Sequence, residues 1–172
     1  MSNDPLVYEF VCKLSELPPG SKKCIELSIT HRNVMILNLQ GKVFCMDQAC
    51  YHHGGPLFNG DIEEIDSKMI VKCPWHAYHI VVETGEGIYK GVNMTMTSSG
   101  KLQPSSPKLK SKGVKQRTHL VELRNGGQDI YIADSSAIPG ASIIESDMYA
   151  FRTINIPETA KKGEVQIHSR FE

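Results

Sequence analysis

The sequence predicts an all-β protein built mainly from antiparallel strands. Short apolar runs are separated by turn signals, among them Pro18-Pro19-Gly20, His31-Arg32-Asn33 and Gln40-Gly41-Lys42. The chain has 172 residues, which fits one domain of ordinary size, and its 40% hydrophobic and 22% charged residues are sufficient for a packed core. Nineteen basic and nineteen acidic residues cancel, which argues against the positive field that nonspecific nucleic-acid binding requires.

The expected elements are strands joined by short turns. They are predicted at residues 8–12, 24–29, 34–39 and 43–47, and then at 69–72 and 79–82. A hairpin of residues 119–123 and 129–133 closes the sheet, because its connection contains an Asn-Gly step that suits a tight turn. Residues 97–107 lack periodicity and are expected to form a mobile linker.

We expect one domain over residues 1–133, with two candidate ligand loops inside about residues 48–80, and a C-terminal extension over residues 134–172. The extension contains short apolar pieces at 149–156 and 165–167, which allow either an edge strand or irregular packing. The sequence alone does not choose between them.

No apolar run approaches the roughly 20 residues that cross a bilayer, and residues 1–10 show neither a secretory signal nor a presequence. We therefore expect a cytoplasmic monomer with no membrane or nucleic-acid partner. The chain has five cysteines, an odd number that favours reduced thiols or metal ligands over a disulfide framework. Three of them, Cys12, Cys24 and Cys45, are expected to be small buried thiols.

Two short segments carry the chemistry. The first is Cys50-x-His52 and the second is Cys73-x-x-His76, with twenty residues between His52 and Cys73. Each segment supplies one thiolate and one imidazole, so two loops folded together would present two sulfurs and two nitrogens to one inorganic centre. A tetrahedral zinc site could use these ligands, although zinc modules usually pair Cys with Cys and His with His. A 2Fe-2S cluster with one iron on two Cys and the other on two His fits the interleaved order.

At these residues the sequence resembles the Rieske iron-sulfur family, and residues 50–93 are most similar to its soluble, ferredoxin-like members from animals. The resemblance extends more weakly from about residue 8 to residue 133. It implies a Rieske fold, with an antiparallel β base and a small cluster-binding subdomain, and one [2Fe-2S] cluster held by Cys50, His52, Cys73 and His76. The separation of the loops is longer than the family's usual spacing, and we place the extra length at residues 59–67 as an enlarged excursion.

High-potential Rieske proteins link their two ligand loops by a disulfide, and the matching places here hold Gly55 and Trp75. The resemblance therefore implies a low-potential cluster of the ferredoxin type. Gly54 and Gly55 allow the chain to approach the cluster closely. His53 and His79 are alternative nitrogen ligands that we expect instead on the surface.

The function that we expect depends on which other sites the sequence provides beside the cluster. A Rieske oxygenase also needs a mononuclear iron site in a large catalytic domain, and the sequence has neither that domain nor a Gly-x-Gly-x-x-Gly fingerprint. The leading hypothesis is a non-enzymatic one-electron carrier between a reductase and a terminal acceptor. The alternatives are a detached Rieske subunit of an oxygenase or nitrite-reductase-like complex, and a zinc-stabilised interaction module.

The basic run Lys108, Lys110, Lys112, Lys115 and Arg117 could steer an acidic redox partner, or it could be a solvated loop.

Overall fold

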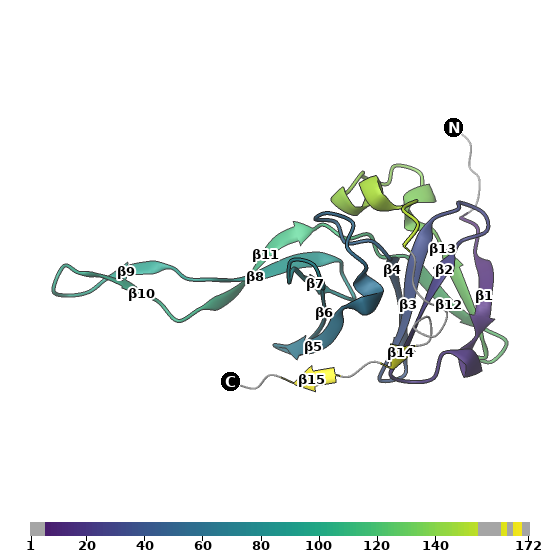
Figure 1. The fold of residues 1–172 in the computed structure, drawn as a ribbon, viewed down its shortest axis with the longest axis horizontal. Helices are drawn as coiled ribbons and strands as arrows, with labels where there is room; N and C mark the ends of the chain where they lie inside the picture. The colour runs from purple at the N-terminus through teal and green to yellow at the C-terminus, as the bar shows by residue number, and fades with distance from the viewer. Residues whose placement is uncertain (1–5, 155–162, 165–166, 170–172) are drawn as a thin grey trace.

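The computed structural model describes residues 6–154 and the backbone of residues 163–164 and 167–169. Its regular elements are β-strands and single 3-10 turns, so the predicted all-β class is confirmed (Figure 1). The 3-10 turns are η1 (Leu14–Glu16), η2 (Leu57–Asn59), η3 (Ser135–Ala137) and η4 (Glu145–Tyr149). Within the described ranges, no helix has the length and apolar character needed to cross a membrane.

Two sheets form the base of the molecule. One has the order β1-β13-β12 and the other the order β14-β2-β3-β4. Their bounds are β1 Glu9–Lys13, β13 Asp129–Ala133, β12 Leu120–Arg124, β14 Gly163–Glu164, β2 Ser21–Glu26, β3 Asn33–Leu39 and β4 Lys42–Asp47. The pairs β1–β13, β12–β13, β2–β3 and β3–β4 are all antiparallel, as the turn pattern predicts.

Strand β3 holds the base to the rest of the molecule because both of its faces are buried. Val34 and Ile36 point into the core between the two base sheets, whereas Met35 and Leu37 point into a second core. A strand covered on both faces needs a continuous apolar run rather than alternation, and the segment Val-Met-Ile-Leu meets that need.

The second core lies under a six-stranded sheet with the order β11-β8-β7-β6-β5-β15. Its strands are β11 Lys108–Val114, β8 Glu86–Gly91, β7 His79–Val81, β6 Lys68–Lys72, β5 Asp61–Ile65 and β15 Ile167–Ser169. Val71 and Ile80 face the second core, while their neighbours Ile70 and Val81 form a smaller cluster with Ile88 on the opposite face. The candidate ligand loops leave and enter this sheet.

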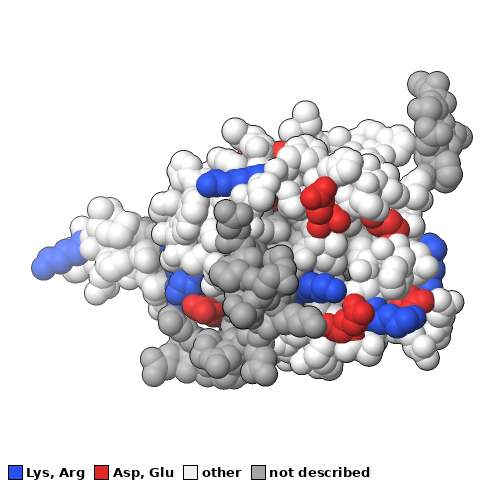
Figure 2. Space-filling model, turned by 45° about the vertical axis from the view of Figure 1, so that its right-hand side comes forward, with Lys and Arg blue, Asp and Glu red and all other residues white. Residues whose placement is uncertain are grey.

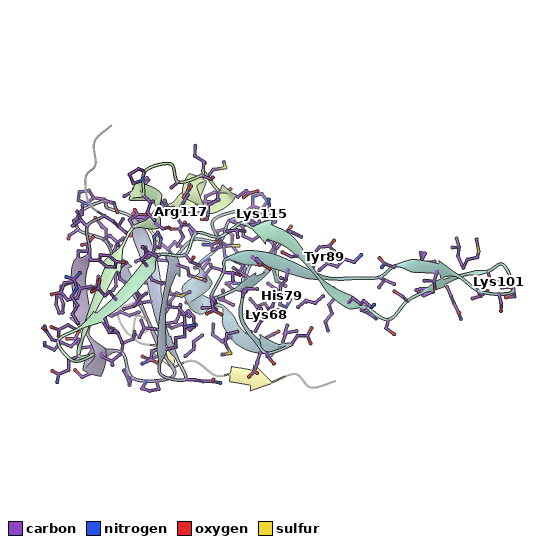
Figure 3. The ribbon with its side chains drawn as sticks, turned by 180° about the vertical axis from the view of Figure 1, so that it is seen from behind. Lys68, His79, Tyr89, Lys101, Lys115 and Arg117 are labelled. Atoms are coloured by element: carbon purple, nitrogen blue, oxygen red, sulfur yellow. The ribbon has the colours of Figure 1, made fainter. Side chains whose placement is uncertain are left out.

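Beyond β8 and β11 the chain continues into an arm, residues 92–107, that projects from the body (Figure 1). The arm contains β9 (Met94–Met96) and β10 (Leu102–Pro104), paired antiparallel. In Figure 3, Tyr89 marks its base and Lys101 lies near its far end. Figure 2 shows acidic side chains on the body and none on the visible face of the arm.

Two segments expected to be irregular connections contain strands in the structure. Residues 97–107, expected to be a linker, include β10, and the excursion expected at residues 59–67 includes β5. The basic run, for which a solvated loop is one of two alternatives, lies mostly on β11. All residues of β9 and β10 are exposed, so neither face of this hairpin required an apolar repeat that the sequence could display. The strand expected at residues 24–29 ends at Glu26, where a turn begins.

A buried charged network joins the base to the residues after β13. The Asp47 carboxylate, at the end of β4, accepts two hydrogen bonds from Arg32 at 2.6 and 2.9 Å and lies 3.0 Å from Nε2 of His119. Asp134 lies 3.4 Å from the other nitrogen of His119. Burial alone raises the pKa of Asp47, but the hydrogen bonds from Arg32 and His119 outweigh burial and hold that pKa below its ordinary value.

We expect Asp47→Asn to lower the free energy of unfolding by about 3–5 kcal/mol, because removal of one partner leaves Arg32 and His119 buried without their balancing charge. Equilibrium denaturation in urea near neutral pH measures this. Glu83→Gln is the matched control, since Glu83 pairs with Lys42 at the surface and its loss should cost at most about 1 kcal/mol. Equal losses in the two variants would contradict the importance we assign to the network.

Candidate metal centre

The two ligand loops have the same backbone design. We define the first ligand loop as residues 50–55 and the second as residues 73–78. In each, the cysteine N–H donates to the carbonyl five residues later, and the N–H four residues later donates to the cysteine carbonyl. The bonds are Cys50 N to Gly55 O (2.8 Å), Gly54 N to Cys50 O (2.7 Å), Cys73 N to Tyr78 O (2.8 Å) and Ala77 N to Cys73 O (3.0 Å).

The turn requires a left-handed residue at the fourth position after each cysteine. Gly54 has φ +70° and Ala77 has φ +55°. Glycine adopts this conformation freely, whereas alanine adopts it at a cost in conformational energy. The hydrogen bond from the Ala77 N–H to Cys73 helps to offset that cost.

Each cysteine sulfur lies inside its loop and accepts hydrogen bonds from backbone N–H groups. Cys50 accepts from His52 and His53, and Cys73 accepts from Trp75 and His76, so the donors are the second and third residues after the cysteine in both loops. Cys50 and Cys73 are 0% and 2% exposed. N–H donors favour the thiolate form, which is the form that binds metal.

The two thiols also face each other. A side-chain hydrogen bond joins Cys50 and Cys73; it lowers the pKa of Cys73 to about 6 and raises the pKa of Cys50. The thiols are therefore close enough to share a proton, and close enough to bind one metal ion together.

The imidazoles of His52 and His76 meet nearer the surface. Their Nδ1 atoms are 3.3 Å apart, and their rings are perpendicular with centroids 4.9 Å apart. The Tyr78 ring stacks on His52 at 4.0 Å and 17°, which fixes the plane of that imidazole. The structure thus brings together all four residues that the sequence singled out, with sulfurs inside and nitrogens outside.

The loops approach each other most closely at Gly55. A Cβ atom at this position would lie 2.8 Å from Cys73 Sγ and 3.1 Å from the Trp75 ring. Both distances are shorter than normal contact, so the second loop can reach its position only because residue 55 has no side chain. The close approach to a bound cluster that the sequence predicts for Gly54 and Gly55 stays a prediction.

Sequence reasoning missed Gln116, which is fully buried in the segment between β11 and β12. Its amide nitrogen donates to Asp47 O at 3.0 Å and Ala49 O at 2.8 Å, and its amide oxygen accepts from Tyr51 N at 2.9 Å. Gln116 therefore fixes the backbone on both sides of Cys50. Nothing near Gln116 in the sequence signals a partner more than sixty residues away.

The other candidate ligands lie as follows. His53 is exposed, and His79 is half-buried beside Glu63, with 3.6 Å between Nε2 and the carboxylate. Cys12 and Cys45 are buried in the base, as expected, and Cys24 is only partly buried. Among the described residues, no three His, Cys, Asp or Glu side chains converge on a point that could hold a single metal ion.

The four side chains fit a [2Fe-2S] cluster of the Rieske type, because they supply the required ligand atoms and lie as two facing pairs. Such a cluster needs two thiolates for one iron and two imidazoles for the other. The thiols form one facing pair and the imidazoles the other. N–H donors to the sulfurs are the kind of hydrogen bond that tunes these clusters.

Comparison with known sequences agrees with this chemistry. The profile of a family described as "Soluble Rieske-type ferredoxin" matches residues 19–137. A human "Rieske domain-containing protein" is 38% identical over 143 residues, which span 83% of this chain and 84% of that protein. Mouse "Apoptosis-inducing factor 3" is 29% identical over 76 residues, only 44% of this chain and 12% of that protein.

Solved structures share the fold at lower sequence identity. The ferredoxin of carbazole 1,9a-dioxygenase from Nocardioides aromaticivorans aligns with a TM-score of 0.51 and 19% identity over 74% of this chain and 98% of that one. A Mycobacterium tuberculosis protein assigned as the small subunit of an NADH-dependent nitrite reductase aligns with a TM-score of 0.54 and 15% identity, over 76% and 96% of the two chains.

We expect Gly55→Ala to weaken metal binding strongly, because the added Cβ would push Cys73 and Trp75 away from the first loop. Metal content per purified chain, measured by plasma emission spectrometry, tests this. Gly91→Ala is the control, since its Cβ would meet only the flexible end of Lys110. Wild-type metal content in Gly55→Ala would show that close approach of the loops is not required.

Proposed function

Because the chain belongs to the family of soluble Rieske-type ferredoxins, we propose that it carries single electrons by means of a [2Fe-2S] cluster bound to Cys50, His52, Cys73 and His76. Proteins of this family are electron carriers rather than enzymes. The observation that carries the residue assignment is the facing of two thiols and of two imidazole Nδ1 atoms on equivalent loops.

The four ligands would lie at two depths, with the thiolates buried and the imidazoles near the surface. Cys50 and Cys73 would hold one iron as buried thiolates, where backbone N–H groups stabilise their negative charge. His52 and His76 would hold the other iron and remain near the surface, so that a partner protein can touch the imidazole edges. The bound cluster supplies reversible one-electron chemistry at this end of the molecule.

We assign the cluster to the low-potential class. None of the five cysteines, all of which lie in the described residues, forms a disulfide, and Gly55 and Trp75 stand where a disulfide would join the loops. Reduction potential depends on hydrogen bonds to sulfur and on solvent exposure. Trp75 is 49% exposed, so this side of the second loop is open to water.

Partners and location follow as parts of the same proposal. The structural neighbours include the ferredoxin of a dioxygenase and a subunit assigned to a nitrite reductase. A reductase would supply the electron here, and an oxygenase or reductase would receive it. Five cysteines without a disulfide suit the reducing cytoplasm. Stable copurification of a second chain would instead favour a subunit of a multi-chain oxidoreductase.

The direct test is iron and sulfide content. We expect two irons and two acid-labile sulfides per wild-type chain, the composition of a [2Fe-2S] cluster, and loss of both in Cys73→Ser. Cys24→Ser is the control, because Cys24 is a partly buried thiol outside the ligand loops. One zinc per chain and no colour, even after anaerobic reconstitution with iron and sulfide, would refute the proposal and favour the zinc module.

We further propose that Lys112 attracts the redox partner. Its Nζ lies 4.6 Å from the centroid of the Tyr78 ring, and Tyr78 stacks on His52. Lys112 is one residue of the basic run, and residues 87–121 contain no acidic side chain. An acidic partner surface would therefore meet the Lys112 ammonium group beside the imidazoles of His52 and His76.

Oxidation of the reduced protein by ferricyanide, a trivalent anion, tests this without a known partner. Lys112→Gln should slow the reaction about fivefold at low ionic strength, since one charge about 8 Å away changes the attraction of this anion by roughly 1 kcal/mol in water. Lys101→Gln is the control, because Lys101 lies near the far end of the arm (Figure 3). Equal rates for the two variants would remove Lys112 from the docking surface.

A further inference from the structure

The segment after the family match reaches back across both ligand loops. We define the strap as residues 145–152, which comprise η4 and the turn that follows it. The Tyr149 hydroxyl donates to His52 O at 3.4 Å, and Arg152 Nη1 donates to His53 O at 3.0 Å. Both bonds hold the backbone of the first ligand loop immediately beside the candidate ligand His52.

Arg152 also contacts the second ligand loop. Its guanidinium carbon lies 5.2 Å from the centroid of the Trp75 ring, within the range of a cation–π interaction. One side chain therefore joins the two loops, with its nitrogen on the carbonyl of His53 and its planar face on Trp75.

The strap lies directly against the first loop. A Cβ atom at Gly54 would be 2.5 Å from Arg152 Nη1 and 2.8 Å from the Tyr149 ring, so glycine at this position serves the strap as well as the turn.

The other end of the strap is fixed to the body by buried polar groups. Ser146 donates to the Asp47 carboxylate at 2.5 Å and accepts from the Arg117 N–H at 2.8 Å. Asp147 accepts two hydrogen bonds of 2.6 Å from the Arg117 side chain. Asn33 N donates to Ala150 O at 2.9 Å. Because its base is anchored in this way, the strap can hold Tyr149 and Arg152 in place over the loops.

We propose that the strap is a non-covalent crosslink between the two ligand loops, in which Arg152 is the positioning residue that joins them. It connects the loops that a disulfide would otherwise join, at positions where this chain has no cysteine to form one. By keeping the loops together, the strap slows the loss of the bound metal centre. The consequence for the cluster rests on the proposed function; the crosslink itself rests only on the contacts above.

Arginine suits this place because its planar guanidinium can donate in its plane while its face stacks on an aromatic ring. Lysine would keep the positive charge but could not make both contacts in the same geometry. Arg152→Lys therefore separates the effect of the crosslink from that of the charge.

The first measurement is the rate of cluster loss. The loaded full-length protein is mixed with excess bathophenanthroline, and the decay of visible absorbance is followed. Arg152→Ala should lose its cluster at least about tenfold faster than wild type, because one hydrogen bond from a charged group and one cation–π contact that hold the loops together are removed. Arg152→Lys should fall between the two. Arg124→Ala is the control, because Arg124 stacks on Tyr131 at 4.3 Å on the base, away from the ligand loops.

The second measurement reports on the contact whichever metal the protein holds. Trp75 is the chain's single tryptophan, so its emission observes the strap directly. In protein as purified, acrylamide should quench Trp75 more strongly in Arg152→Ala than in wild type or Arg124→Ala. If Arg152→Ala does not fold, Arg152→Lys and Tyr149→Phe are compared in its place.

Unchanged quenching and unchanged rates of cluster loss in the folded Arg152 variants would overturn the proposal. Changed quenching with an unchanged rate of loss would overturn its consequence for the cluster. A wild-type protein without iron would refute the proposed function, and the quenching measurement would still decide whether the crosslink exists.

Discussion

The close approach of two equivalently folded loops is the constraint on which the candidate centre depends. Each loop turns its cysteine sulfur inward onto N–H donors and directs a histidine outward. The loops meet where Gly55 leaves no room for a side chain against Cys73. The six-stranded sheet places the loops side by side, because the second loop joins the paired strands β6 and β7 while the first loop leads by way of η2 into β5, which also pairs with β6.

The buried charged network around Asp47 fixes the backbone that leads into the first ligand loop. Asp47 accepts hydrogen bonds from Arg32 and Ser146 through its carboxylate and from Gln116 through its carbonyl, three residues before Cys50. Buried ion pairs contribute little net stability compared with apolar packing, since the charges lose hydration. In this molecule they fix positions: the carboxylate of Asp47, at the end of β4, holds Arg32, the residue before β3, and Ser146 of the strap. These bonds fix the backbone that leads into the first ligand loop.

The extent to which the sequence predicts this structure follows from how local each feature is. The ligand pairs are recognisable because each Cys and His lie within one short loop, and the hairpin at Asn125-Gly126 is recognisable because both residues adopt positive φ as its turn requires. The strands of the arm and β11 were not predicted, because their exposed faces need no apolar repeat that the sequence could display. Gln116, Tyr149 and Arg152 act on residues far away in the sequence, which no local pattern encodes. The domain boundary at residue 134 stays a prediction, since residues 134–154 pack on the body although the family match ends at residue 137.

The most direct test of the central claim is pulsed electron paramagnetic resonance of the reduced protein with its histidines labelled with nitrogen-15. We expect strong coupling of the cluster's unpaired electron to two histidine nitrogens. One coupling should be lost in each of the variants His52→Cys and His76→Cys that retain a cluster, and both should be kept in His53→Ala. A reduced cluster without coupled histidine nitrogen, or one whose couplings survive both His→Cys changes, would contradict the assignment of Cys50, His52, Cys73 and His76.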